Sequence, residues 1–187
     1  GVTPTPTPTI DFIVEDGSEV ANANAYCLDT FADSYHALYG NPTAWSSLTQ
    51  AAKQEAIRKA TRACDERYLD LWNGDQVTVT QSLAWPRAYV TDPTGDDYYA
   101  DNVIPTELQQ WVARAALLVA QGYTLEAETE SSATLKSETL RSAGGFEKSV
   151  EYLGGKSPQT QYPALDAMLE KANLIENAGA GWGYSEA

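Results

Sequence analysis

Apolar residues recur at helical spacing in two long segments, and this pattern constrains the fold more than any other feature of the sequence. The first segment runs from Thr49 to Trp72 and the second from Pro105 to about Gln121. Positions three and four residues apart share one face of a helix, and an apolar face is buried against another element. We therefore expect two long helices. Their buried faces are Ala52, Ile57, Ala60, Cys64, Tyr68 and Leu71 in the first, and Leu108, Trp111, Val112, Ala115, Leu118 and Val119 in the second.

Start and stop residues mark the ends of these helices and predict two shorter ones. Ser or Thr followed three residues later by an acid or Gln is typical of a helix start, as is a proline in the first turn. A glycine after the last turn is typical of a helix end. The start signals are Thr30 with Asp33, Ser47 with Gln50, Pro105 with Thr106, and Pro163; the stop signals are Gly40, Asn73-Gly74 and Gly122.

Several short segments have the composition or alternation of β-strands. Trp85-Pro86 follows Gln76 to Gln81 and breaks that strand, because proline cannot donate to a strand ladder. Gly144-Gly145 lies between two others and indicates a hairpin turn. Asp92 to Asn102 is instead a polar loop. The predicted strands are Ile10 to Val14, Gln76 to Gln81, Leu135 to Leu140 and Phe146 to Tyr152.

Together these elements predict an α+β fold that is mainly α: a small helical bundle with one or two β-hairpins and extended N- and C-terminal arms. The main domain spans residues 10–176. Residues 1–9 contain the run TPTPTPT, which favours extended polyproline II as an arm or linker, although a disordered terminus fits equally well. Residues 177–187 (NAGAGWGYSEA) form a flexible tail that carries two aromatic residues.

The charge of the chain argues against a protein that grips nucleic acid. Asp and Glu number 26 against 12 Lys and Arg, which gives a net charge of -14, and the first basic residue is Lys53. Affinity for DNA comes from Lys and Arg placed at phosphates, because binding releases counterions. A local basic patch is still compatible with the sequence. High net charge also keeps a free subunit soluble.

The chain lacks the residue constellations of an enzyme or a metal centre. Its single histidine, His36, has no nucleophile at a readable spacing, and Cys27, His36 and Cys64 lack zinc-ligand spacing and a fourth donor. We expect both cysteines to be buried thiols. The Asp92–Asp101 loop is rich in carboxylates but differs from a calcium loop, so a solvated acidic loop is favoured over a cation site. We therefore expect no catalysis, no cofactor and no metal.

Exposed aromatic residues could stack on single-stranded bases, but such stacking needs cationic surroundings. Tyr98 and Tyr99 are flanked by acids, and Trp182 and Tyr184 lie in an acidic tail. Aromatic side chains in such a tail more often anchor in a protein pocket.

No secretory signal is recognisable, and no apolar run approaches the ~20 residues of a membrane span. The longest apolar run is Ala115 to Ala120. We expect a soluble protein that is made in a cytoplasm and has no membrane partner.

A series of short segments follows in a fixed order between about residues 12 and 175. They are Val14 to Gly17, Ala21 to Tyr26, Tyr39 to Asn41 with Trp45, Lys53 to Tyr68, Gln81 to Arg87, Ile104-Pro105, Leu135 to Glu138, Val150 to Tyr152 and Tyr162 to Asp166. The ordered set resembles tailed-phage head–tail adaptor (head-completion, connector) proteins, which are often labelled DnaT-like single-stranded-DNA-binding proteins. The Thr-Pro arm, the long Asp92–Asn102 loop and the Gly-rich aromatic end depart from that pattern.

The resemblance implies a structural virion protein that forms a ring of about twelve copies beneath the portal. Such a ring extends the DNA channel, lets DNA pass without specific binding, and docks the tail, a stopper or a tail terminator. It belongs to the neck of the virion and is assembled in the host cytoplasm. In similar adaptors the C-terminal segment reaches the portal, which implies portal-binding roles for Leu174, Ile175, Trp182 and Tyr184.

Mixed-sign charges on the first long helix suit a polar contact between subunits, where complementary charges set the register. A merely solvated helix face explains them equally well. The residues concerned are Arg58, Arg62, Asp65, Arg67 and Asp70. The rival function is a single-stranded-DNA-binding replication accessory protein, which would need a basic groove studded with aromatic residues. A small hydrolase is a third possibility, disfavoured by the lack of catalytic motifs.

Overall fold

The computed structural model describes residues 10–125, 140–141, 147–148 and 162–176. These residues fall into two compact units. The larger unit, here called the helical domain, contains the described residues up to Leu125 and from Tyr162 onward. The smaller unit lies within Glu126–Gln161 and contains a single described strand pair.

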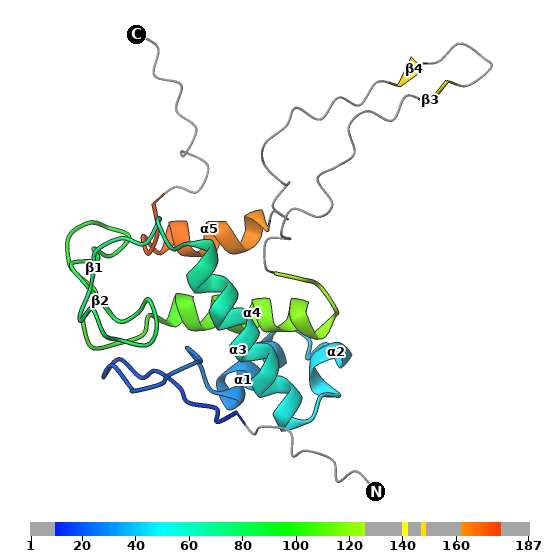
Figure 1. The fold of residues 1–187 in the computed structure, drawn as a ribbon, viewed down its shortest axis with the longest axis horizontal. Helices are drawn as coiled ribbons and strands as arrows, with labels where there is room; N and C mark the ends of the chain where they lie inside the picture. Colours follow the sequence, from blue (N-terminus) through cyan, green and yellow to red (C-terminus); the bar gives the residue numbers. More distant parts are fainter. Residues whose placement is uncertain (1–9, 126–139, 142–146, 149–161, 177–187) are drawn as a thin grey trace, which may run out of the picture. The chain divides into compact units, whose positions relative to one another are not determined.

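The described residues form five helices and four two-residue strands (Figure 1), which confirms the predicted α+β, mainly α fold. Both strand pairs are antiparallel, with Asp75 opposite Ala88 in the first and Leu140 opposite Lys148 in the second. The helices are α1 (Asp29–Leu38), α2 (Thr43–Ser46), α3 (Gln50–Arg67), α4 (Thr106–Ala120) and α5 (Pro163–Lys171); the pairs are β1 (Asp75–Gln76) with β2 (Arg87–Ala88) and β3 (Leu140–Arg141) with β4 (Glu147–Lys148).

Helix α4 is the centre of the helical domain, because it contacts each of the other four helices. Figure 1 shows α3 crossing α4, with α5 on the opposite side from α1 and α2. The sequence explains this position: Trp111 and Val112 fill the predicted apolar face, while Ala113 and Ala116 extend burial around the helix. Small side chains allow neighbouring helices to approach α4 on more than one side.

Two helix ends differ from the predictions. Helix α1 begins at Asp29 after the N-cap Leu28, not with Thr30 as a cap. Helix α3 is capped by Thr49, whose hydroxyl accepts a hydrogen bond from the Ala52 amide at 3.3 Å, not by Ser47. It ends at Arg67, five residues before the predicted end, because the chain turns there and places Trp72 opposite Ile175. Helices α4 and α5 begin after Pro105 and at Pro163, as predicted.

Two of the predicted strands are wrong in whole or in part. Ile10 to Val14 makes one bridge only, between Val14 and Ala25. Of Gln76 to Gln81, only Gln76 belongs to a strand, and Val79 lies at an exposed turn, 95% exposed. The hairpin predicted around Gly144-Gly145 is confirmed where β3 pairs with β4. The remaining residues of that hairpin and both predicted arms lie outside the described residues.

The buried carboxylate of Glu15 holds the loop of residues 15–20 that follows the expected strand. Its Oε1 accepts hydrogen bonds from the amides of Gly17 and Glu19, both at 2.9 Å, and Oε2 accepts from the amide of Val20 at 2.8 Å. Gly17 has φ +104°, and a Cβ there would lie 2.1 Å from the carbonyl oxygen of Asn102. This close approach requires glycine and joins the loop to the segment before α4.

None of the helices within the described residues is long and apolar enough to span a bilayer.

Replacing Glu15 with Gln should destabilise the helical domain by about 1–3 kcal/mol, since an amide cannot accept from all three buried N–H groups. Urea unfolding followed by tryptophan fluorescence measures the change. The exposed Asp11→Asn is the matched control. An unchanged free energy of unfolding in Glu15→Gln would show that the loop does not depend on this carboxylate.

Candidate functional site

His36 is a structural residue of the core. Its Nε2 lies 3.0 Å from the carbonyl oxygen of Ala113 in α4, which assigns the proton to Nε2 because a carbonyl only accepts. The ring is packed between Tyr35 and Trp45, with centroid distances of 5.4 and 4.9 Å. Burial lowers the pKa of His36, which favours the neutral ring. Its role is to join α1 to α4.

The two cysteines are buried, unpaired thiols, as predicted. Burial and the nearby Asp29 raise the pKa of Cys27 to about 12, and burial raises that of Cys64 well above its usual value. Thiols held protonated in this way are poor nucleophiles and poor metal ligands. The described residues bring together no group of three His, Cys, Asp or Glu side chains that could hold a metal. In the acidic loop, Asp92 Oδ1 accepts hydrogen bonds from Thr94 and Gly95.

The predicted subunit-contact residues on α3 fall into two groups. Asp65 and Arg67 face inward: Arg67 makes a bidentate pair with Asp166 of α5, at 3.0 Å for both bonds. Arg62 is exposed and pairs with Glu66 on the same helix at 2.7 Å. Arg58 is half-buried, and Asp70 is exposed beyond the end of α3. The predicted contact between subunits therefore depends on Arg58, Arg62 and Asp70.

Asp65 of α3 is hydrogen-bonded to the loop between β1 and β2. Its carboxylate accepts hydrogen bonds from Tyr26 Oη at 2.6 Å and from the Ala84 amide at 3.0 Å. Tyr26 Oη in turn accepts from the Trp85 amide at 3.1 Å. Burial raises the pKa of Asp65 to about 6, although these hydrogen bonds and the charge of Arg87 lower it.

The predicted portal-binding residues Leu174 and Ile175 lie in the core, at 0% and 2% exposure. Ile175 forms an antiparallel bridge with Trp72, and the Glu176 amide donates to the Leu71 carbonyl at 2.8 Å. These contacts fix the point at which residues 177–187 leave the helical domain. Trp182 and Tyr184 lie outside the described residues, so their predicted role stays a prediction.

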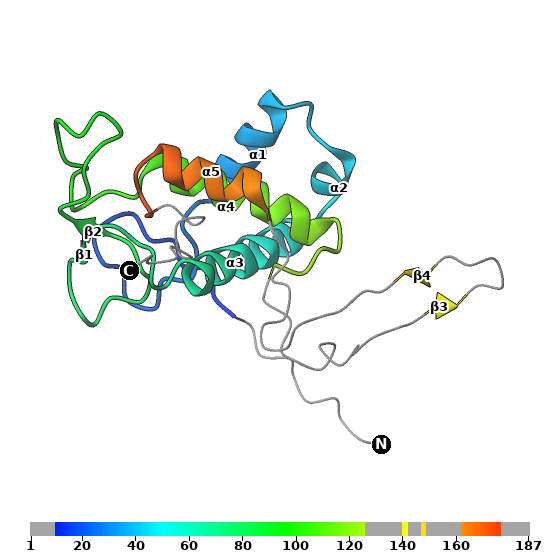
Figure 2. The same cartoon turned by 90° about the horizontal axis from the view of Figure 1, so that it is seen from above.

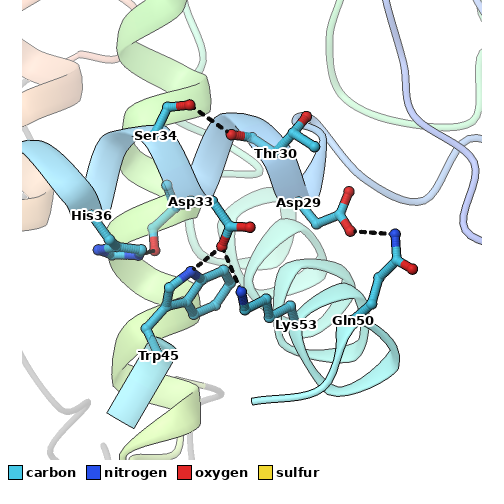
Figure 3. A network of polar contacts seen from close by, with 9 residues as sticks. Asp29, Thr30, Asp33, Ser34, His36, Trp45, Gln50 and Lys53 are labelled. Carbon is cyan, nitrogen blue, oxygen red and sulfur yellow. Dashed lines mark hydrogen bonds and ion pairs between the residues drawn. The ribbon is translucent and has the colours of Figure 1, made fainter. Parts of the chain in front are cut away.

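Figure 3 shows a polar network that joins α1, α2 and the start of α3. Asp33 Oδ1 accepts hydrogen bonds from Trp45 Nε1 and from Lys53 Nζ, both at 2.8 Å. Asp29 accepts from Gln50 Nε2 at 2.8 Å. Asp33 is predicted only as part of a helix start, and α2 is not predicted, because a helix of four residues shows no apolar periodicity.

Several basic side chains of the helical domain donate to a carboxylate or a carbonyl of the same domain. The side chains of Lys53 and Arg67 are largely buried in their pairs, so these cations are not available to neutralise phosphate, whereas Lys59 and Arg62 remain exposed. Tyr99, half of a possible base-stacking pair, donates its hydroxyl to the Ala172 carbonyl at 2.9 Å and is half-buried. The ion pairs are Lys53–Asp33, Lys59–Glu55, Arg62–Glu66 and Arg67–Asp166, and Arg87 donates to the carbonyls of Asn73, Gly74 and Ala84.

Asp65→Asn should change how stability depends on pH. Between about pH 4 and pH 6 the folded chain retains a proton on Asp65 that the unfolded chain, with a pKa near 3.8, releases. The stability contributed by Asp65 is therefore greatest below pH 4 and falls as the pH rises to 6.

We expect the free energy of unfolding of wild type minus that of Asp65→Asn to fall by about 2–3 kcal/mol between pH 4 and pH 7. Urea unfolding at each pH measures it, with the exposed Asp70→Asn as the matched control. If the difference in free energy of unfolding did not vary with pH, the raised pKa of Asp65 would be wrong.

A family model with the description "Putative DnaT-like ssDNA binding protein" matches residues 10–185. No curated protein and no solved structure matches the chain. Because the family match covers nearly the whole sequence, the chain belongs to the family described as "Putative DnaT-like ssDNA binding protein".

Proposed function

We propose that this protein is a structural head–tail adaptor of a tailed phage, without catalytic activity. Copies of it form a ring beneath the portal in the neck of the virion, where the ring extends the DNA channel and docks the tail or a stopper. The ordered motifs between about residues 12 and 175 support the proposal through their resemblance to adaptor proteins. The helical domain, with a hairpin inserted between α4 and α5, supports it as well.

The main observation in support of the proposal is that basic side chains bond inside the helical domain while the chain as a whole is acidic. Lys53, Arg67 and Arg87 are used inside the helical domain, while the net charge of the chain is -14. DNA that must move through a channel should not be held by its wall, and an acidic wall repels phosphate. This distribution suits a conduit for DNA better than a DNA clamp.

The family description favours a second function, single-stranded DNA binding in replication. That function needs a groove in which cations follow the backbone and aromatic rings stack on bases. Among the described residues, Tyr98 is an exposed ring, but it follows Asp96 and Asp97 directly. The charge around this ring therefore opposes the rival function.

Two binding assays on the full chain separate the two functions. The first is co-sedimentation with the purified portal protein of the same phage, and the second is fluorescence anisotropy with a labelled oligothymidylate at about 50 mM salt, where phosphate contacts are strongest. The adaptor function predicts portal binding and no oligonucleotide binding up to micromolar protein. Tight oligonucleotide binding without portal binding would establish the rival function instead.

Two truncations should separate portal binding from folding. Ending the chain after Glu176 removes the predicted anchors Trp182 and Tyr184 but keeps Leu174 and Ile175 in the core. We expect this variant to keep its thermal midpoint and to lose portal binding.

Ending the chain after Asn173 also removes Leu174 and Ile175, and it should cost several kcal/mol of stability because two buried aliphatic side chains are lost. Differential scanning fluorimetry and co-sedimentation with the portal measure both effects. Full portal binding by the chain that ends at Glu176 would show that residues 177–187 are not the portal contact.

A further inference from the structure

A long stretch of the helical domain carries no charged side chain, although charged residues make up 20% of the chain. Residues 34–52, here called the neutral corner, contain no Asp, Glu, Lys or Arg. They comprise most of α1, the connection to α2, α2 itself and the first residues of α3. The two charged residues that bound the stretch, Asp33 and Lys53, form an ion pair with each other at 2.8 Å and so cancel.

The neutral corner exposes large apolar side chains. Leu38 is 80% exposed and Tyr39 is 69% exposed, at the end of α1. The ring of Tyr39 packs against that of Tyr35, with a centroid distance of 4.9 Å. In Figure 2 the end of α1 and the connection to α2 lie at an outer edge of the helical domain. Exposed apolar side chains that gather in this way mark a surface for a partner.

The backbone beneath this surface is held in place before any partner binds. The amides of Tyr39 and Asn41 both donate to the His36 carbonyl, at 3.1 and 2.8 Å. Trp45 is fully buried, and its indole donates to Asp33, which ties α2 to α1. A surface that is already ordered loses little entropy on binding.

We propose that the neutral corner of each copy docks on the adjacent copy of the chain. This inference rests on the proposed function, because a ring places every copy beside an identical copy with a net charge of -14. Like charges repel across most of such a contact. In a ring the corner of one copy meets a different surface of the next copy. A stretch without charged side chains of its own meets an acidic neighbour at a lower electrostatic cost than an acidic stretch would. A basic partner would instead be matched by the acidic surface.

This contact differs from the charged contact predicted on α3 in its response to salt. A contact of Arg58 and Arg62 with acids of a neighbour weakens as salt screens the attraction. A contact through the neutral corner strengthens, because salt screens the repulsion between the two copies while the apolar contact persists. Raising salt from about 20 mM to about 300 mM shortens the screening length and should tighten self-association.

The test compares wild type with Leu38→Asp/Tyr39→Asp. The matched control is Leu69→Asp/Val79→Asp, which adds the same two negative charges at exposed apolar residues outside the corner. Self-association is measured by sedimentation velocity at both salt concentrations, and the number of copies bound to the portal by native mass spectrometry. Thermal midpoints establish that all three chains are folded.

We expect the corner variant to weaken self-association at least about tenfold, or to lower the number of copies bound to each portal. We expect Leu69→Asp/Val79→Asp to change either quantity by less than about twofold. Unchanged assembly of the corner variant on the portal overturns the inference and leaves the proposed function standing. Self-association through the corner without any portal binding supports the inference and removes the proposed function. A wild-type chain that neither self-associates nor binds the portal in several copies overturns the inference. If the double variant unfolds, Tyr39→Asp and Val79→Asp are compared by the same criteria, and equal self-association of the two overturns the inference.

Discussion

The carboxylate of Asp166 receives three hydrogen bonds, and the closure of the helical domain depends on them. Arg67 donates two at 3.0 Å, and Tyr68 Oη donates the third at 2.6 Å. Bidentate guanidinium–carboxylate pairs are strong and directional, so they fix the position of α5 on α3. With α5 in place, Leu174 and Ile175 reach the core and define where the C-terminal segment begins. The cost of closing a long loop grows slowly with its length, so this joint permits the insertion of Glu126–Gln161 between α4 and α5.

Because basic side chains are paired inside the domain, they also affect the charge of its outer surface. Cations that join elements, such as Arg67 and Arg87, are withdrawn from any external partner, and the remaining surface is dominated by carboxylates. An acidic surface suits a passage for DNA and opposes contact between copies. The uncharged residues 34–52 then become the natural place for such a contact. The proposed conduit and the proposed docking surface thus follow from one distribution of charge.

The fold class and helices α4 and α5 could be predicted because local signals agree with burial there: Pro163 starts α5, and an apolar face runs along α4. Predictions failed where partners distant in sequence decide the structure. In the predicted strand Ile10 to Val14, the side chain of Asn24 accepts from the Ile13 amide and donates to the Asp11 carbonyl, so a side chain takes the place of a strand partner. Asp65 and Arg67 were predicted as surface charges, yet Tyr26 and Asp166, 39 and 99 residues away, draw them inward. No local pattern displays such partners.

Quantitative mass spectrometry of phage particles purified from cells that produce this chain tests the central claim most directly. The claim is that the protein is a permanent part of the neck and not a replication factor. It predicts that the chain remains in particles after nuclease treatment and high-salt washing, at about the copy number of the portal's cyclic symmetry, roughly twelve. Abundance in infected cells together with absence from washed virions would contradict the account.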